Sequence, residues 1–418
     1  MGLVPDWWLR VRAAPDLALR QKTGGAMSGP LQGVRVIELA HVMAGPVAGL
    51  MLADMGAEVI KVERPTGDDT RHSAPFIGDQ AASYMMMNRN KRGIVLNLKD
   101  PDQVAALRQM IKTADVVLEN YRKGTMEKLG LGYDDLKEDN PGLIYGSISG
   151  FGRTGPYADR AGFDLIAQGM SGLMAVTGEG PGRPPCKVGP PVSDITAGIL
   201  LAMGVCAALA HRRETGQGQI VETSLFEAAI THTYWQSAIA FATGQDPEPM
   251  GSAHPLNAPY QAIQTADGYI NIGAANQGNW LRLIRLIGAE HLGEDPRFSV
   301  NTERMANRRE LESELNAIFT SKTSAEWLTL LEEGGFPAGP VLSIREMQAD
   351  PQTIARDMVP VVDHPELGMV QTIGLPVKFS ETPGGIRQAA PTLGQETDKI
   401  LSEYGLALKP ANDPQAPE

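Results

Sequence analysis

Residues 33–65, "GVRVIELAHVMAGPVAGLMLADMGAEVIKVERP", predict a strand, a helix and a second strand in succession. Residues 33–40 are short, rich in β-branched side chains and bounded by glycine, which is typical of a buried strand. The segment 45–57 carries Pro46 where we expect the first helical position, because proline is tolerated there. Residues 58–65 form the next strand, which Pro65 ends. This order predicts an α/β fold with a parallel sheet.

The same alternation continues through the first half of the chain. We expect further strands in residues 92–100, 115–120 and 142–149, and an amphipathic helix in residues 101–114. Strands that alternate with short helices indicate a doubly wound parallel sheet, covered by helices on both faces.

After a long apolar helix that begins near residue 193, the pattern changes. We expect a strand and a helix in residues 218–236, a hairpin in residues 259–274 with its turn at Asp267-Gly268, and helices in residues 279–288 and 307–321. From about Met358 onwards we expect short strands interrupted by prolines, followed by a last short helix within residues 391–405. A chain of 418 residues with such a change of pattern is expected to hold two domains.

Net charge, hydrophobicity and cysteine content exclude several classes of function. The net charge of −12 argues against nucleic acid as the main partner and against an anionic membrane surface, although a local basic pocket stays open. The most apolar run, residues 195–210, is shorter than a membrane span of about 18 residues. Two cysteines, Cys186 and Cys206, and scattered histidines form no metal or disulfide pattern, so a reducing, cytoplasmic compartment is expected. We expect residues 1–26, which lack the apolar core of a signal peptide, to be a disordered extension or the product of an early start codon, and residues 409–418 to be a loose tail.

Two short motifs carry possible chemistry. In "PPVSDITAG", residues 190–198, Asp194 stands where a helix begins. It is either an N-cap, a role that Ser193 beside it also suits, or a carboxylate nucleophile favoured by the helix N-terminus. "GFGRTG", residues 150–155, matches a dinucleotide-binding loop, but Pro156 follows where a helix should begin. A glycine-rich active-site loop is therefore the favoured interpretation of residues 150–155.

Five longer blocks occur in order: "GVRVIELAHVMAGPVAGLMLADMGAEVIKVERPTGDDTR", "NRNKRGIVLNLKDPDQ", "ADVVLENYRKGTMEKLGLGYDDL", "GSISGFGRTGPYADRAGFDLIAQGMSGLM" and "PTLGQET". Together they resemble the class III CoA-transferases, a family that also contains carnitine CoA-transferase and α-methylacyl-CoA racemase, over about residues 31–405. The resemblance implies a Rossmann-like large domain with a parallel sheet made from both chain ends, a smaller inserted α+β domain and an interlocked homodimer. The expected boundaries are 27–224 for the first part of the large domain, 225–345 for a linker and the small domain, and 346–408 for the return.

The resemblance also implies roles for the acidic residues. Asp194 matches the family's nucleophile, which attacks a CoA thioester and forms an aspartyl mixed anhydride and then an aspartyl–CoA thioester. Asp164 falls where formyl-CoA transferases carry a catalytic acidic residue; the alternative is a helix cap. Because a carboxylate bonded to its own helix is a poorer nucleophile, we expect Ser193 to cap the Asp194 helix. Phe163 replaces a histidine of the racemases and cannot move a proton. A racemase-like enzyme and a non-catalytic CoA-ester-binding protein stay as alternatives.

The resemblance further implies a site for coenzyme A, which acts as the thioester substrate, with no tightly bound cofactor and no metal. Basic side chains in this site suit a ligand with three phosphates, and a solvated surface role is the alternative for each. The matching positions are Met43, Ala44, Arg64, Leu96, Asn97, Leu98, Lys99, Asn120, Tyr121, Arg122, Lys128, Arg160, Ala161, Gly162 and Phe163.

Residues 250–280, "MGSAHPLNAPYQAIQTADGYINIGAANQGNW", look like the branch of the family that acts on dicarboxylic acids of the succinate or glutarate type. His254 is then expected to meet a distal carboxylate; an ordinary loop histidine is the alternative. The resemblance thus implies transfer of CoA from an acyl-CoA, with succinyl-CoA as one candidate donor, to a carboxylic acid. The identities of donor and acceptor stay open.

Overall fold

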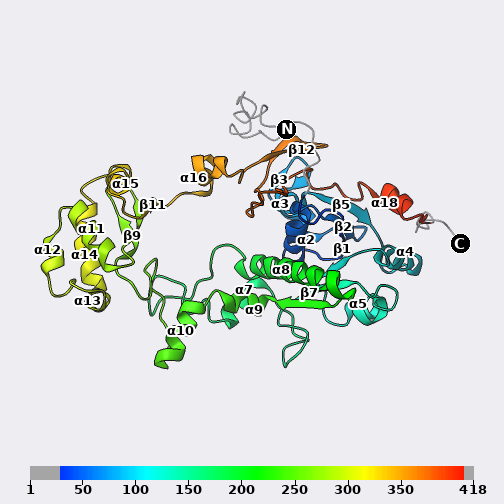
Figure 1. Cartoon of the computed structure of the whole chain (residues 1–418), viewed down its shortest axis with the longest axis horizontal. Helices are drawn as coiled ribbons and strands as arrows, with labels where there is room; N and C mark the ends of the chain where they lie inside the picture. Colours follow the sequence, from blue (N-terminus) through cyan, green and yellow to red (C-terminus); the bar gives the residue numbers. More distant parts are fainter. Residues whose placement is uncertain (1–28, 409–418) are drawn as a thin grey trace.

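A six-stranded parallel sheet forms the centre of the larger part of the protein (Figure 1). A computed structural model describes residues 29–408, so the predicted extension 1–26 and tail 409–418 lie outside the described residues. The strands stand in the order β5-β2-β1-β6-β7-β8, and every neighbouring pair is parallel. Their bounds are β1 Arg35–Glu38, β2 Glu58–Glu63, β5 Lys91–Val95, β6 Val116–Glu119, β7 Ile144–Ser149 and β8 Ile220–Ser224. This is the strand order of a Rossmann-type sheet, and the predicted doubly wound parallel sheet is confirmed.

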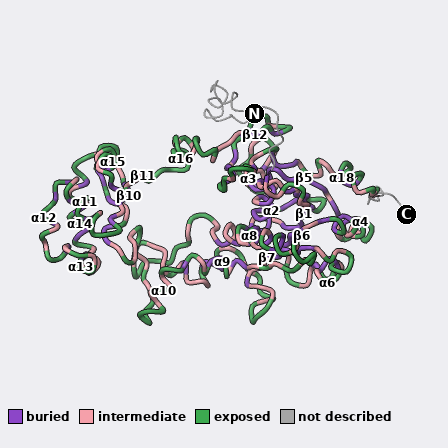
Figure 2. The backbone as a smooth tube through the Cα atoms, in the orientation of Figure 1, coloured by how far each residue is buried: buried purple, intermediate pink, exposed green. Residues whose placement is uncertain are grey.

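Helices cover both faces of this sheet because neighbouring strand residues point to opposite sides. Val36 lies in one core and Ile37 in the other. The first core includes α2 (Ala44–Asp54), α8 (Val192–Thr215) and α9 (Leu225–Thr231). The second includes α4 (Pro101–Ile111), α5 (Thr125–Lys128), α6 (Tyr133–Leu136) and α18 (Thr397–Glu403). Figure 2 shows the buried positions concentrated along the strands and these helices.

Two helices differ from their predicted bounds. α2 begins at Ala44, so Pro46 is its third residue rather than its first. α8 runs for 24 residues to Thr215, beyond the expected apolar run, and it is long and apolar enough to cross a membrane by length and composition alone. Its inner side packs on α2, where an ideal Cβ on Gly198 would lie 2.6 Å from the carbonyl oxygen of Ala44. Packing inside the protein therefore accounts for the apolar residues on that side of α8.

A second body has its own core and its own sheet. The predicted hairpin is confirmed as β9 (Tyr260–Gln264) and β10 (Tyr269–Gly273), and β11 (Ala338–Pro340) adds an antiparallel third strand. The helices here are α11 (Gln277–Leu286), α12 (His291–Glu294), α13 (Asn301–Ala306), α14 (Arg308–Phe319) and α15 (Ser324–Glu333). Figure 1 shows this body well apart from the six-stranded sheet. Two separate segments connect them, one carrying α10 (Tyr234–Thr243) and the other α16 (Ile344–Ala349) and α17 (Pro351–Ala355).

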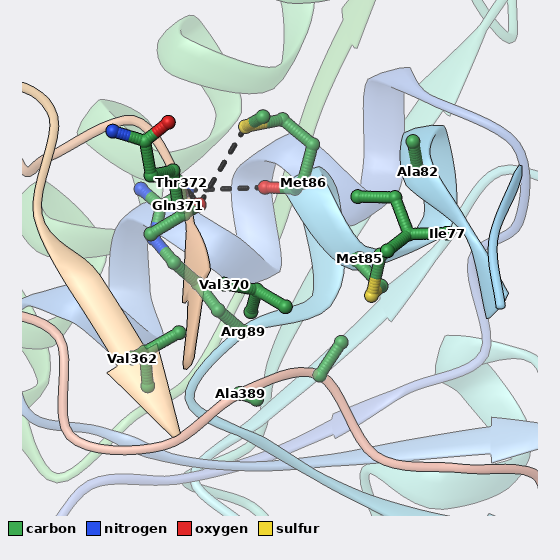
Figure 3. Close-up of a pocket in the computed structure, with 11 residues that line it drawn as sticks. Ile77, Ala82, Met85, Met86, Arg89, Val362, Val370, Gln371, Thr372 and Ala389 are labelled. Carbon is green, nitrogen blue, oxygen red and sulfur yellow. Dashed lines mark hydrogen bonds between the residues drawn. The ribbon is translucent and has the colours of Figure 1, made fainter. Parts of the chain in front are cut away.

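The last part of the described chain returns to the parallel sheet but adds no strand to it. The expectation of a parallel sheet made from both chain ends is therefore wrong, because all six strands lie within residues 35–224. The hairpin of β12 (Val361–His364) and β13 (Gly368–Gln371) lies beside α3 (Ala82–Asn88), with a cavity of about 50 Å³ between them that Figure 3 shows. Met85, Val362 and Val370 line this cavity, which is far too small for a nucleotide. Next, α18 docks beside β5, where Arg92 forms ion pairs with Glu396 and Glu403.

The approach of α2 to α8 gives the first testable prediction. In Gly198→Ala, the new Cβ would meet the Ala44 carbonyl oxygen at 2.6 Å and the Val47 Cβ at 2.7 Å, and neither is the end of a flexible side chain. We expect the free energy of unfolding to fall by about 1–3 kcal/mol despite the better helix propensity of alanine. Midpoints of urea unfolding measure this change.

A matched helical control is Gly169→Ala in α7 (Asp164–Met170). There the nearest neighbour of the new Cβ is the Met174 sulfur at 3.7 Å, an ordinary contact. Stability should be unchanged or rise by about 0.5–1 kcal/mol, because alanine is the better helix former. Equal effects at the two positions would mean that the contact between α2 and α8 does not limit the size of residue 198.

Candidate active site

The strand order of the parallel sheet reverses between β1 and β6. In open α/β sheets, ligands bind outside the carboxyl ends of the strands at such a reversal. Here the carboxyl ends of β1, β2 and β6 surround a cavity of about 210 Å³. Its lining residues are Leu39, Ala40, His41, Lys61, Val62, Glu63, Arg64, Gly67, Asp68, Asp69 and Tyr121. We call this cavity the switch-point pocket.

Arg64 and Tyr121 are the predicted CoA-binding residues in the switch-point pocket. The Arg64 side chain is 55% exposed; its Nε donates to the Gly67 carbonyl oxygen at 2.9 Å, and its guanidinium pairs with Asp69. The Tyr121 ring lies 5.1 Å from the His41 ring, centroid to centroid. Burial lowers the pKa of His41, so this imidazole is neutral near pH 7. The pocket therefore combines one accessible cation with a flat aromatic wall.

Asn120 lies beside the pocket, but both polar ends of its side chain are occupied. Its Nδ2 donates to the His41 carbonyl oxygen at 2.8 Å, and its Oδ1 accepts the His41 N–H at 2.9 Å. Two other predicted positions, Ala44 and Leu96, have side chains buried in the protein core. A ligand could therefore contact Asn120, Ala44 and Leu96 mainly through their backbone groups.

The remaining predicted positions surround this edge of the sheet. Met43, Asn97 and Leu98 are half-buried, and Lys99 is exposed. Four more predicted positions are exposed: Arg122, Lys128, Arg160 and Ala161. The Arg160 guanidinium lies 5.1 Å from the Tyr157 ring centroid. Gly162 packs against Gly150, and Phe163 is 74% exposed. Residues 160–163 lead directly into α7, whose first residue is Asp164.

The predicted acidic pair comes together where α7 and α8 begin. The Oδ1 of Asp164 accepts the backbone N–H of Ser193 at 2.8 Å, and its Oδ2 accepts from Gln168 Nε2 at 2.8 Å. Asp164 thus satisfies a free N–H at the start of α8 from outside that helix. The expectation that Ser193 caps α8 is wrong. The helix begins at Val192, which makes Ser193 its second residue, and the Ser193 Oγ is buried without a partner in the described chain.

Asp194, the third residue of α8, keeps its carboxylate free. Within residues 29–408 no hydrogen bond reaches its side-chain oxygens. Burial, helped by the negative charge of Asp164, raises the pKa of Asp194 to about 6. A carboxylate that is ionised at neutral pH, more basic than usual and placed at a helix N-terminus is suited to attack an electron-poor carbonyl.

His254 lies in the segment between α10 and β9. Its ring stacks on Tyr260 with centroids 5.1 Å apart, and Trp235 contacts it edge-on at 5.8 Å. The Nδ1 of His254 accepts the Leu256 N–H at 3.1 Å, so a neutral ring carries its proton on Nε2. The described chain gives His254 no contact with the acidic pair.

Sequence reasoning missed Lys61 and Asp68, which form part of the switch-point pocket. The side chains of Lys61, Asp68 and Glu38 are all at most 1% exposed, and Lys61 pairs with both carboxylates. A lysine within the apolar strand "EVIKVE" was the available signal, because a buried charge requires a partner. Glu63, another acid at a strand end, is bound within the protein. It accepts hydrogen bonds from the Arg71 guanidinium and, at Oε2, from the Tyr84 hydroxyl.

Comparisons with known proteins agree on one family. The family model of CoA-transferase family III matches residues 31–397. A succinate–glutarate CoA-transferase of Agrobacterium fabrum is 41% identical over 90% of this chain and 95% of its own. An acetyl-CoA:oxalate CoA-transferase of Acetobacter aceti is 38% identical over 92% of this chain and 98% of its own. The crystal structure of a CAIB/BAIF family protein from Brucella suis superposes with a TM-score of 0.81 at 38% identity, covering 90% of this chain and all of that one.

The raised pKa of Asp194 predicts a pH-dependent cost to stability. Its pKa is about 6 in the folded protein against an ordinary value of 3.8, so ionisation of Asp194 destabilises the fold progressively between those pH values and fully above pH 6. Asp194→Asn should therefore raise the free energy of unfolding at pH 7.5 by up to about 3 kcal/mol. Near pH 4 the difference should shrink towards zero. Chemical denaturation across this pH range measures it.

Asp79→Asn is a suitable control, since it removes an exposed carboxylate in the turn between β3 (Phe76–Ile77) and β4 (Gln80–Ala81), outside α7 and α8. Its stability should follow that of the unmodified protein at every pH. A constant stability difference between Asp194→Asn and the parent protein from pH 4 to pH 7.5 would exclude an elevated pKa at Asp194.

Proposed function

The chain belongs to CoA-transferase family III, and from that premise we propose that it transfers coenzyme A from an acyl-CoA thioester to a dicarboxylic acid, with Asp194 as the covalent carrier. The observation that carries this proposal is the Asp194 carboxylate at the start of α8, which accepts no hydrogen bond within residues 29–408, lies next to a second carboxylate and has a raised pKa. The names of the relatives from Agrobacterium and Acetobacter, which act on succinate, glutarate and oxalate, support dicarboxylates as the substrate class.

The first half of the reaction forms an anhydride. A carboxylate oxygen of Asp194 attacks the thioester carbonyl carbon, the carbon–sulfur bond breaks, and the CoA thiolate leaves. The oxyanion that develops on the substrate is stabilised by the N-terminal end of α8. With a pKa of about 6, Asp194 is mostly ionised at neutral pH, so no separate base is needed. The product is a mixed anhydride between Asp194 and the donor acid.

The second half moves CoA to the acceptor. The thiolate attacks the Asp194 carbonyl of the anhydride, and the donor acid leaves as a carboxylate. The acceptor carboxylate then attacks the resulting aspartyl–CoA thioester, forms a new anhydride and releases the thiolate. The thiolate finally attacks the acceptor carbonyl, which yields the new acyl-CoA and restores Asp194. Every step exchanges one activated acyl bond for another, so the thioester energy is kept and no water is consumed.

Asp164 acts on this chemistry mainly through Asp194. By accepting the Ser193 N–H at 2.8 Å it fixes the first turn of α8, where Asp194 stands. Its negative charge also contributes to the raised pKa of Asp194. We therefore assign Asp164 a positioning and electrostatic role next to the nucleophile.

The two substrates would occupy different sides of Asp194. The nucleotide of CoA would bind at the switch-point pocket, which Arg64 lines. Lys99, Arg122 and Lys128, which are exposed and follow β5 and β6 in the chain, would offer further positive charge to its phosphates. The distal carboxylate of the acid would accept a hydrogen bond from Nε2–H of His254, whose ring Tyr260 and Trp235 hold in place. Coenzyme A is a substrate in this scheme, and a reducing cytoplasm remains the expected compartment.

We further propose an interlocked homodimer. The two connecting segments and the two bodies surround an opening through which a second chain could pass (Figure 1). Large apolar residues are exposed on α7, α8 and α10 of the single chain, as expected where a second subunit covers them. They include Leu165 at 51%, Ile199 at 47%, Met203 at 63%, Trp235 at 59% and Phe241 at 90% exposure. A second subunit that covers them would also bring its own second body towards the acidic pair.

Covalent catalysis by Asp194 gives a direct prediction. Asp194→Ala should lose at least about 10³-fold in kcat, because the proposed reaction then lacks its covalent carrier. In the parent protein, incubation with succinyl-CoA and hydroxylamine should convert Asp194 to a hydroxamate, which peptide mass spectrometry detects.

Two further measurements support this test. Asp194→Ala should bind CoA as tightly as the parent protein, which separates lost chemistry from lost folding. Neither protein should exchange the α-proton of a 2-methylacyl-CoA for solvent deuterium, since Phe163 offers no proton-transfer group. Substantial transfer by Asp194→Ala would refute the role of Asp194, and rapid deuterium uptake would favour a racemase.

The interlocked assembly predicts very slow subunit exchange. Tagged and untagged protein mixed at room temperature should form no hybrid dimers over hours, because exchange requires a subunit to unfold. Dilution to nanomolar concentration should give no monomer in light scattering or mass photometry. Partial denaturation in urea followed by refolding of the mixture should produce hybrids, which serves as the positive control. Hybrids within minutes under native conditions would indicate an ordinary surface dimer.

A further inference from the structure

The connection between β1 and α2, residues 39–43, is held at three consecutive backbone positions by side chains from elsewhere. Lys61 Nζ donates to the carbonyl oxygen of Ala40 at 2.9 Å. Asn120 binds both the N–H and the carbonyl group of His41. The N–H of Val42 points at the carboxylate of Asp68, 3.2 Å from each oxygen. These bonds fix the backbone of residues 40–42, in addition to the packing of the buried Leu39 side chain in the core.

Val42 is the position where such restraint matters most. Its φ angle is 65°, in the left-handed region that β-branched residues rarely adopt. Val42 is 43% exposed, so packing of its side chain contributes little to this conformation. A strained backbone persists only where surrounding interactions enforce it. The interaction available to Val42 is the hydrogen bond to Asp68.

Asp68 is itself anchored in a buried ionic cluster. Its carboxylate lies 3.0 Å from Lys61 Nζ, and it accepts the N–H and the hydroxyl of Thr70 at 3.0 and 2.9 Å. Burial opposes ionisation of Asp68, yet the charge of Lys61 and the bonds from Thr70 hold its pKa well below the usual range. Lys61 also pairs with Glu38 at 3.3 Å, and Lys91 pairs with Glu38 at 2.8 Å. The cluster therefore contains two cations and two anions and is internally balanced.

The connection that Asp68 restrains links the switch-point pocket to the nucleophile. Leu39, Ala40 and His41 form one wall of the pocket. The chain then enters α2, and the carbonyl oxygen of Ala44 packs against Gly198 in α8, one helical turn after Asp194. A change in the conformation of Val42 would therefore move both the wall of the pocket and the contact between α2 and α8.

We propose that Asp68 is a positioning residue for acyl-CoA: held by Lys61, it keeps Val42 in the left-handed conformation that shapes the switch-point pocket. This inference rests on the proposed function, because it takes CoA as the ligand of that pocket. The Asp68 carboxylate contacts Lys61, Thr70 and the backbone N–H of Val42, so we assign its effect on the pocket to residues 41–44. Glycine adopts a positive φ without strain. The need for Asp68 should therefore disappear when residue 42 is glycine.

The test combines Asp68→Asn with Val42→Gly and measures CoA affinity by calorimetry. Asp68→Asn keeps the size of the side chain but removes its charge, and we expect Kd for CoA and KM for acyl-CoA to rise about tenfold while kcat changes less. Asp68→Asn/Val42→Gly should recover a Kd within about threefold of Val42→Gly alone. Thr70→Val, a milder variant that removes only the hydroxyl bond to Asp68, should raise Kd two- to threefold. Asp102→Asn, an exposed acid at the start of α4, is the charge-matched control.

The outcomes separate this inference from the function it rests on. An unchanged Kd in both Asp68→Asn and Thr70→Val would overturn the positioning role. So would a double variant that binds as weakly as Asp68→Asn, since the loss would then reflect general damage rather than the conformation of Val42. Failure of the parent protein and of Asp194→Ala to bind CoA at all would instead overturn the proposed function.

Discussion

The contact between α2 and α8 is the constraint on which the rest of the site depends. The two helices approach so closely at Gly198 that a single added carbon would lie 2.6 Å from the Ala44 carbonyl oxygen. Because α2 follows β1 and α8 carries Asp194 near its start, this contact puts the pocket at the reversal of strand order and the free carboxylate at the same edge of the sheet. If these helices lay farther apart, the fold could persist, but the switch-point pocket and the Asp194 carboxylate would move away from each other.

Around this contact, charge is distributed unequally. Next to the pocket, which Lys61 and Asp68 also line, two lysines balance two carboxylates: Lys61 and Lys91 pair with Glu38 and Asp68. At the start of α8, by contrast, two carboxylates lie close together, and no cation pairs with Asp194 within the described residues. The paired charges stabilise the scaffold. Burial and the repulsion between Asp164 and Asp194, however, disfavour the ionised form of Asp194 and raise its pKa. Asp194 is reactive because its carboxylate has neither a cation nor a hydrogen-bond donor beside it within the described residues. The carboxylates of the neighbouring cluster are instead paired with lysines.

The sequence predicted the elements well where the hydrophobic pattern was strong. The alternation of strands and helices through residue 149, and the hairpin at residues 259–274, follow from local patterns that tertiary contacts reinforce. Asp194 was identifiable because a proline pair and a long apolar helix surround it. The residue that caps α8 could not be predicted in the same way. It is Asp164, which lies 29 residues before Ser193 in the chain, and no local sequence rule relates the two positions. The left-handed Val42 was equally hidden, since its cause is a buried carboxylate at residue 68.

The docking of α18 beside β5 has a consequence for how the protein is made. Arg92, in an edge strand of the parallel sheet, finds partners in Glu396 and Glu403, more than 300 residues later in the chain. During synthesis, that edge must remain uncovered until residues up to 403 have left the ribosome, whereas the second body can form its core from the continuous stretch of residues 258–338. Completion of the six-stranded sheet region is therefore a late, long-range event in biosynthesis. Until α18 arrives, the β5 edge is open to pairing with other chains, so this part of the protein is where a chaperone would be most useful.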